Sequence, residues 1–182
     1  MRIMIIRHGK VNMKWPKFCS SSEFDMACAE YDRSDLESIN VTPLNEQTDR
    51  IYVSKLSRSV NTAKILFPDK DYCEMPEIGE VPLISFMDTE KRLPLWIWNI
   101  LGRVQWYIGN TRQLEIRNGT VQRANKVVDF LESENEDCIL ITHGFFMKTL
   151  VRIFKNRGYS LSGNKMLEIK NLQTIWAEKQ QV

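Results

Sequence analysis

Residues 3–9 read IMIIRHG, four apolar residues followed by an arginine, a histidine and a glycine. A short continuous apolar run that ends in polar residues is typical of a strand buried on both faces of a sheet. Two later segments share this pattern: IYV at 51–53 leads to Ser54, and CILI at 138–141 leads to His143. Three such strands, separated by helical patterns, predict a parallel sheet covered by helices on both faces.

The helices that we expect have apolar residues at helical spacing. They lie at about 22–31, 57–66, 93–108, 111–132 and 145–156, and two final strands are expected at 166–169 and 174–177. A capping box is expected at 22–25, and Ser57 is expected to cap the second helix. The predicted fold class is therefore α/β, a three-layer sandwich with a central mostly parallel sheet, in one domain over residues 1–182.

The helix at 93–108 is apolar nearly all round, with Pro94 suited to its first turn and Gly109 to its C-terminal end. One stripe at helical spacing consists of Leu93, Ile97, Ile100, Leu101, Val104 and Ile108, and the other side carries Trp96, Trp98 and Trp106. We expect the stripe to pack on the body, and the tryptophans to line the mouth of a site beneath a helical lid at about 81–118. A homodimer contact is the alternative use of that aromatic face.

The composition excludes several classes of protein. The 182 residues include 25 basic and 23 acidic side chains, a net charge of +2 that gives no bulk attraction for nucleic acid or an anionic membrane. No apolar run approaches the length of a membrane span. The spacing of Cys19, Cys28, Cys73 and Cys138 fits no zinc site, so we expect reduced thiols in a cytoplasmic protein without nucleic-acid or membrane partners.

Cationic and imidazole side chains follow the predicted strands where each strand ends. Arg7 and His8 follow the first, Arg58 lies shortly after the second, and His143 follows the third. The carboxyl ends of parallel strands share one edge of a sheet, so we expect these residues to converge. Guanidinium groups and helix N-termini match phosphate oxygens, whereas Arg7 beside His8 would repel a cation. The sequence therefore predicts a phosphate site with no metal.

The chemistry that fits such a site is transfer of a phosphoryl group to histidine. A neutral imidazole nitrogen attacks phosphorus in line, cations hold the equatorial oxygens, and the leaving alkoxide takes a proton from an acid. Glu77 and Glu80 both lie in a segment that offers that acid. The chain has two histidines, and both His8 and His143 follow predicted strands and precede a glycine. This repetition favours function over two core histidines that bond only to backbone.

Three segments in this order resemble the motifs of the histidine phosphatase superfamily, also called the phosphoglycerate-mutase-like family. They are RHG at 7–9, VSKLSRSVNTA at 53–63 and ITHG at 141–144. The resemblance implies that His8 is the phosphorylated nucleophile. It also implies that Arg7, Arg58 and His143 bind the phosphoryl group.

The resemblance further implies a glutamate as the general acid. We prefer Glu80 because EVPL at 80–83 is similar to a segment found in one branch of the family, and Glu77 is the alternative. Residues 10–12 read KVN, where better-known members often have an acidic residue and then a threonine or serine. This departure and the short chain favour hydrolysis over the mutase reaction.

We therefore expect a metal-independent histidine acid phosphatase-type phosphomonoesterase without a cofactor. Its expected substrate is a small phosphomonoester with an apolar or aromatic portion. A phosphomutase of the same chemistry, and a phospho-ligand-binding domain without turnover, remain the alternatives.

Overall fold

Strand β1 (Arg2–Arg7) lies inside a six-stranded sheet in the computed structural model, which describes residues 1–163 and 169–179. The strand order is β4-β3-β6-β1-β8-β7. Strands β3 (Ile51–Val53), β4 (Cys73–Glu74) and β6 (Cys138–Thr142) form the parallel part with β1. Strand β8 (Thr174–Glu178) is antiparallel to β1 and to β7 (Ser160–Gly163). The predicted α/β class with a mostly parallel sheet is confirmed.

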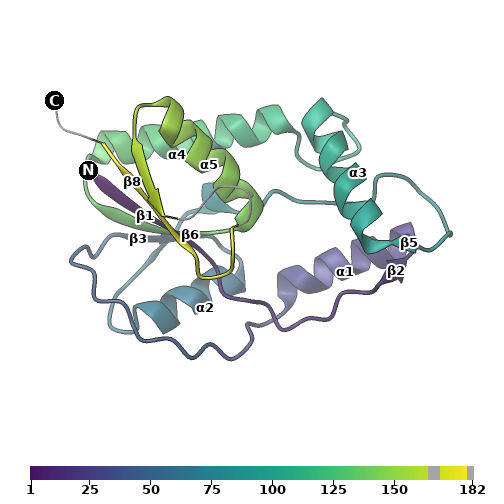
Figure 1. The fold of residues 1–182 in the computed structure, drawn as a ribbon, viewed down its shortest axis with the longest axis horizontal. Helices are drawn as coiled ribbons and strands as arrows, with labels where there is room; N and C mark the ends of the chain where they lie inside the picture. The colour runs from purple at the N-terminus through teal and green to yellow at the C-terminus, as the bar shows by residue number, and fades with distance from the viewer. Residues whose placement is uncertain (164–168, 180–182) are drawn as a thin grey trace.

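Side chains of β1 alternate between two buried layers. Ile3 and Ile5 pack in the core beneath α4 (Arg117–Glu134) and α5 (Gly144–Asn156). Met4 and Ile6 face the opposite way and pack with α2 (Ser57–Leu66). Figure 1 shows α4 and α5 on one side of the sheet and α2 on the other. Each of these side chains contributes roughly 1.5–3 kcal/mol by burial, so apolar packing on both faces holds β1 in place.

A smaller hydrophobic core lies beyond the carboxyl end of β1 (Figure 1). It is built by α1 (Ser21–Arg33), α3 (Leu95–Ile108) and a two-stranded sheet of β2 (Phe18–Cys19) and β5 (Leu93–Pro94). The rings of Phe24 and Trp98 stack there with centroids 5.6 Å apart. The short 3-10 helix η1 (Pro76–Ile78) packs beside β6 and leads into the segment between the two cores.

The orientation of α3 contradicts the prediction from its apolar stripe. Trp98 is fully buried and Trp106 is 8% exposed, whereas the stripe residues Ile100, Val104 and Ile108 are 53%, 45% and 69% exposed. The side with Trp98 and Trp106 therefore packs on the body, whereas Trp96, which is 62% exposed, faces outward with most of the aliphatic stripe. Trp98 cannot line the mouth of a site, because it has no exposed surface.

Gly102 explains why the tryptophan side is the buried one. It lies one turn from each of the two buried tryptophans, and a β-carbon there would lie 2.6 Å from Leu83 Cδ1. The missing side chain lets the preceding segment, at Leu83 and Ile84, pack directly on the helix. Both buried indole N–H groups find acceptors, Trp98 at the Cys19 carbonyl (3.0 Å) and Trp106 at the Thr120 hydroxyl (2.9 Å). The hydropathy pattern of α3 alone does not show which side of the helix another segment can approach closely.

Several element boundaries differ from the prediction. The capping box lies two residues before its predicted position. Ser20 is the N-cap: its N–H donates to Glu23 Oε2 (2.8 Å), and the Glu23 N–H donates to the Ser20 hydroxyl. Ser57 is the first residue of α2 and makes no cap.

Helix α4 begins at Arg117 rather than at 111, because residues 111–115 form a turn. Gly109 ends α3 with φ at 79°, as expected. Strand β7 was not predicted, and the strand predicted at 166–169 falls mostly outside the described residues.

All four cysteines are free thiols, and Cys138 is buried in β6. Within the described part of the chain, no helix is both long and apolar enough to cross a bilayer.

Candidate active site

His8 directly follows β1 and is 1% exposed. Its Nδ1 lies 2.7 Å from the Gly9 carbonyl oxygen. Because a carbonyl only accepts, Nδ1 must carry the proton, which leaves the lone pair on Nε2. Burial, and then the positive charge of Arg58, lower the pKa of His8 from 6.5 to about 3. The ring is therefore neutral at physiological pH and has a free nucleophilic nitrogen.

His143 occupies the N-cap position of α5, and its ring centroid lies 4.9 Å from that of His8. Its Nε2 lies 2.7 Å from the hydroxyl of Ser54 and 3.3 Å from that of Ser59. Its Nδ1 accepts from Arg58 Nε at 3.2 Å, so the ring proton is on Nε2 in this arrangement. Burial, followed by the charges at His8 and Arg58, lowers the pKa of His143 well below its usual value. This second imidazole is also neutral.

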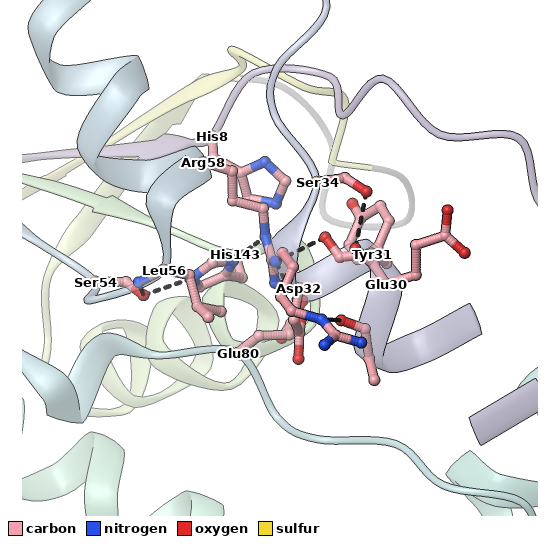
Figure 2. A network of polar contacts seen from close by, with 12 residues as sticks. His8, Glu30, Tyr31, Asp32, Ser34, Ser54, Leu56, Arg58, Glu80 and His143 are labelled. Carbon is pink, nitrogen blue, oxygen red and sulfur yellow. Dashed lines mark hydrogen bonds and ion pairs between the residues drawn. The ribbon is translucent and has the colours of Figure 1, made fainter. Parts of the chain in front are cut away.

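Arg58 lies in the first turn of α2 and is fully buried. Its Nη1 donates to Asp32 Oδ1 (2.9 Å) and to the Tyr31 carbonyl (3.4 Å), both in the last turn of α1. Its Nη2 is buried and has no hydrogen-bond partner among the described residues. Figure 2 shows Arg58 next to His8 and His143, with Asp32 on its outer side. Asp32 is half-exposed, so solvent screens part of the negative charge that it places beside Arg58.

Arg7 ends β1 and lies against the first residue of α5. A β-carbon on Gly144 would lie 2.9 Å from Arg7 Nε and 3.1 Å from its Cζ. The guanidinium donates through Nη1 to the Ile169 carbonyl, and its buried Nε has no partner among residues 1–163 and 169–179. The two glycines that follow the histidines thus have different neighbours: Gly144 makes room for Arg7, and Gly9 packs beside Ile39.

Glu80 lies at the start of α5, close to the second histidine. Its carboxylate accepts the N–H groups of Val81 (2.9 Å), Phe146 (3.0 Å) and Phe145 (3.4 Å). The latter two are orphan donors at a helix N-terminus, where a negative charge is favoured. Figure 2 shows Glu80 in the same group as His143. Glu80 therefore lies close to the second histidine, and its role as the general acid stays a prediction.

Glu77 lies in a different part of the surface. Its side chain is exposed and lines a groove with Tyr52, Cys73 and Lys126. It contributes to the site only through its backbone, because its carbonyl accepts from Arg123 Nη1 at 2.6 Å. The structure does not bring the Glu77 carboxylate to the histidines.

The segment that carries Glu80 is anchored from three elements. Arg123 of α4 donates to the Gly79 carbonyl (2.8 Å), and Thr142 of β6 donates to the Ile78 carbonyl (2.6 Å). Arg103 of α3 donates to the Val81 carbonyl (3.1 Å), and its guanidinium covers the Phe145 ring at 3.8 Å. These bonds fasten the segment on both sides of the carboxylate.

The turn after β1 depends on residues that the sequence analysis gave no role. Gly9 N–H donates to the Thr62 hydroxyl (2.9 Å), which in turn donates to the Arg58 carbonyl (2.6 Å). Asn171 Nδ2 donates to the carbonyls of His8 (2.9 Å) and Gly9 (3.2 Å). The next residue, Leu172, has φ at 61°, an unusual conformation for a non-glycine residue.

Only Thr62 had a signal in the sequence, since it lies one turn after Arg58 in the second motif. Asp32 and Asn171 reach the site through the fold, from segments without a motif.

The family model of histidine phosphatase superfamily branch 1 matches residues 3–180. The chain belongs to the histidine phosphatase superfamily, branch 1. No curated protein matches the chain.

Solved structures of this fold include enzymes with different substrates. A phosphoserine phosphatase mutant from Entamoeba histolytica, in complex with phosphoserine, has 18% identity and a TM-score of 0.51, covering 85% of this chain and 80% of that one. A putative alpha-ribazole-5'-P phosphatase from Escherichia coli has 13% identity and a TM-score of 0.55, covering 95% and 96%.

A phosphoglycerate mutase from Bacillus anthracis has 14% identity and a TM-score of 0.56, covering 96% of this chain and 86% of that one. At these identities the likeness concerns the fold. The superfamily membership supports a phosphomonoester as the class of substrate.

Proposed function

We propose that this histidine phosphatase superfamily member hydrolyses phosphomonoesters through a phosphohistidine at His8, without a metal or cofactor. The observation that carries the proposal is the buried N–H of two arginines beside a neutral imidazole. Arg58 Nη2 and Arg7 Nε are buried without partners among the described residues. A buried unpaired donor on a cation is costly, and a phosphoryl group with three acceptor oxygens would satisfy both.

In the first step, His8 Nε2 attacks phosphorus and the bond from phosphorus to the ester oxygen breaks. Its Nδ1 bond to the Gly9 carbonyl holds the ring in the tautomer that this attack needs. Arg7 and Arg58 hold the equatorial oxygens, where the transition state carries its charge. The Glu80 carboxylate takes up a proton from the bound phosphomonoester monoanion and gives it to the leaving alkoxide. In the second step, water attacks phosphohistidine, loses a proton to the Glu80 carboxylate, and inorganic phosphate leaves.

His143 binds the phosphoryl group after a change of tautomer. Its Nε2 faces the Ser54 hydroxyl, which can either accept or donate. When Ser54 donates to Nε2, the ring proton moves to Nδ1, the nitrogen that faces Arg58 and the site. Arg58 Nε, which loses its acceptor on the ring, then turns its N–H to the phosphoryl group, and the Nδ1–H of His143 donates to a phosphoryl oxygen. The neutral state of the ring makes this switch possible without a net change of charge.

The part of the substrate beyond the phosphoryl group binds between the histidine site and α3. The chain works as one domain in which residues 81–118 form a lid over the carboxyl ends of the strands. An apolar depression of about 560 Å³ lies beside the Glu80 segment, and its walls include Val104, Trp106, Tyr107 and Phe145. Phe145 also donates its N–H to Glu80, so the depression begins next to the leaving group. It favours an ester with an apolar or aromatic portion.

The first test is release of phosphate from p-nitrophenyl phosphate in the presence of EDTA. We expect activity in the wild type and a loss of at least about 1,000-fold in His8→Ala, since the nucleophile is removed. Acid trapping of labelled phosphate on the protein, with release of free phosphate rather than transfer to a second ester, separates hydrolysis from a mutase. Undiminished activity in His8→Ala would disprove the proposal.

The two glutamates form a matched pair for the second test. Glu80→Gln should lower turnover of an alkyl phosphate by roughly 100-fold, in the range that general acid catalysis supplies. It should affect p-nitrophenyl phosphate less, because nitrophenolate leaves without a proton. Glu77→Gln should leave both rates unchanged. Equal losses in the two variants would exclude Glu80 as the acid.

A further inference from the structure

The outward face of α3 is apolar along the whole helix. Six large side chains on it are between 38% and 69% exposed: Trp96, Ile100, Leu101, Val104, Tyr107 and Ile108. We call these six residues the α3 face; Val104 and Tyr107 also form part of the wall of the apolar depression, so self-association and binding of the apolar portion of a substrate involve the same side chains. The one charged residue of the helix, Arg103, lies to the side, where it bonds to backbone carbonyls and covers Phe145. The six side chains carry no charge; the guanidinium of Arg117 in α4 lies 4.6 Å from the centroid of the Tyr107 ring, and the exposed Asn99 adjoins Ile100, so polar groups border the α3 face.

The area of the α3 face is close to that of a stable interface. With about 200 Å² for a whole large apolar residue, six residues at these exposed fractions present on the order of 600 Å². Contiguous apolar patches larger than a few hundred Å² mark interaction sites in soluble proteins. A standard interface buries about 800 Å² on each partner, including its polar rim. The α3 face therefore supplies the apolar centre of one such interface.

We propose that two copies of this chain associate through their α3 faces, with the two helices antiparallel about a two-fold axis near Ile100. Trp96, Ile100, Val104 and Ile108 follow each other at intervals of four, which forms one ridge along the helix. Ridges of this kind pack into the grooves of an identical helix, at a crossing angle of about −50°. An uncharged apolar surface is complementary to itself and brings no like charges together, as a two-fold interface requires.

A membrane surface is the other apolar partner to consider, and α3 lacks the features of an interfacial helix. Such helices carry many basic residues on the side opposite the apolar face. In α3 that side holds the buried Trp98 and Trp106, and the net charge of the chain is only +2. A second copy therefore fits the α3 face better.

Sedimentation analysis between roughly 1 and 200 µM measures this self-association. We expect a mass near twice the 21.4 kDa of one chain at high concentration. Ile108→Glu should raise the dimer dissociation constant at least tenfold and leave phosphatase activity unchanged, because Ile108 lines neither the histidine site nor the apolar depression. The matched control is Met26→Glu in α1, a residue 64% exposed, which should still dimerise.

A mixing experiment identifies the surface that each copy uses. Ile100→Glu and Ile100→Lys should each be monomeric alone, and an equal mixture should form a dimer, because opposite charges then meet near the two-fold axis. A wild type that stays monomeric at the highest concentration overturns the proposal. So does an Ile108→Glu protein that dimerises like the wild type. Binding of monomeric wild type to phosphatidylcholine vesicles, lost in Ile108→Glu, would assign the α3 face to a membrane instead.

Discussion

Replacement of Gly144 by alanine should separate the activity of this protein from its stability. The β-carbon would lie 2.9 Å from Arg7 Nε, 3.1 Å from Cζ and 3.3 Å from Cδ, whereas carbon contacts are ordinarily about 3.5–4.0 Å. Arg7 must therefore move by roughly 0.5–1 Å, a shift that misplaces catalytic groups. The backbone of residue 144 has helical geometry and needs no glycine conformation, so the substitution acts through Arg7.

The size of the effect follows from the bonds that Arg7 would make. Hydrogen bonds to a charged group contribute about 1.5–3 kcal/mol, which corresponds to roughly 10- to 100-fold in kcat/KM. Stability should change by less than about 1 kcal/mol, because alanine also gains up to that amount over glycine in a helix. We expect kcat/KM to fall in this range while the urea midpoint hardly changes.

The same substitution at Gly119 in α4 provides the control. Its β-carbon would meet only Glu115 Cγ at 3.6 Å, an ordinary contact, so Gly119→Ala should keep full activity. A double-mutant cycle of Gly144→Ala with Arg7→Ala should show strong non-additivity, since both act on one guanidinium. Additive losses, or full activity in Gly144→Ala, would refute the assignment of Arg7 to the phosphoryl group.

Three further predictions concern the histidines and α3. Because burial lowers the pKa of His8 from 6.5 to about 3, the unfolded chain binds a proton between these values that the folded chain does not. The free energy of unfolding should therefore fall as the pH drops below 6.5, and urea titrations at pH 7, 6 and 5 should show a shallower fall in His8→Gln. Ser54→Ala removes the nearest partner of His143 Nε2, and steady-state assays should show kcat lowered about tenfold, a loss in the range of one hydrogen bond to a buried polar group. Trp98→Ala should cost about 3–5 kcal/mol of unfolding free energy, and Trp96→Ala less than about 1 kcal/mol when both are measured by urea unfolding of dilute protein.

Each of these predictions has an outcome that contradicts it. Parallel pH profiles of the unfolding free energy for wild type and His8→Gln would mean that folding does not lower the pKa of His8. Unchanged kcat in Ser54→Ala would show that the Ser59 hydroxyl, at 3.3 Å, is sufficient for His143. Equal destabilisation by the two tryptophan substitutions would contradict the orientation of α3.

The sheet could be predicted because its strands carry their own signal. Ile3, Ile5 and Ile139 belong to continuous apolar runs, and burial on both faces leaves no other arrangement for such runs. The convergence of His8 and His143 followed from one rule about the carboxyl ends of parallel strands. Their separation of 4.9 Å further requires β1 and β6 to be neighbours with Arg7 opposite Thr142, and this pairing could not be predicted from the strand signals.

The orientation of α3 and the supporting contacts of the site could not be predicted in this way. Trp98 is buried because Gly102 permits close packing and because the indole N–H meets a carbonyl from another segment. Asp32 reaches Arg58 only once α1 is placed, and Asn171 reaches His8 across 163 residues of sequence. Such contacts depend on three-dimensional positions that no periodicity encodes.

The existence of two separate hydrophobic cores has a consequence for how new specificities arise. The histidines belong to the strands of the large core, whereas α1, α3 and the β2-β5 pair have a core of their own around Phe24 and Trp98. Mutations in the small core change what surrounds the leaving group and do not disturb the packing that holds the nucleophile. Recombination within residues 82–105 is thus a practical way to engineer variants with altered substrates, because Val81 and Trp106 pack in the large core whereas Leu83, Phe86 and Trp98 pack in the small one.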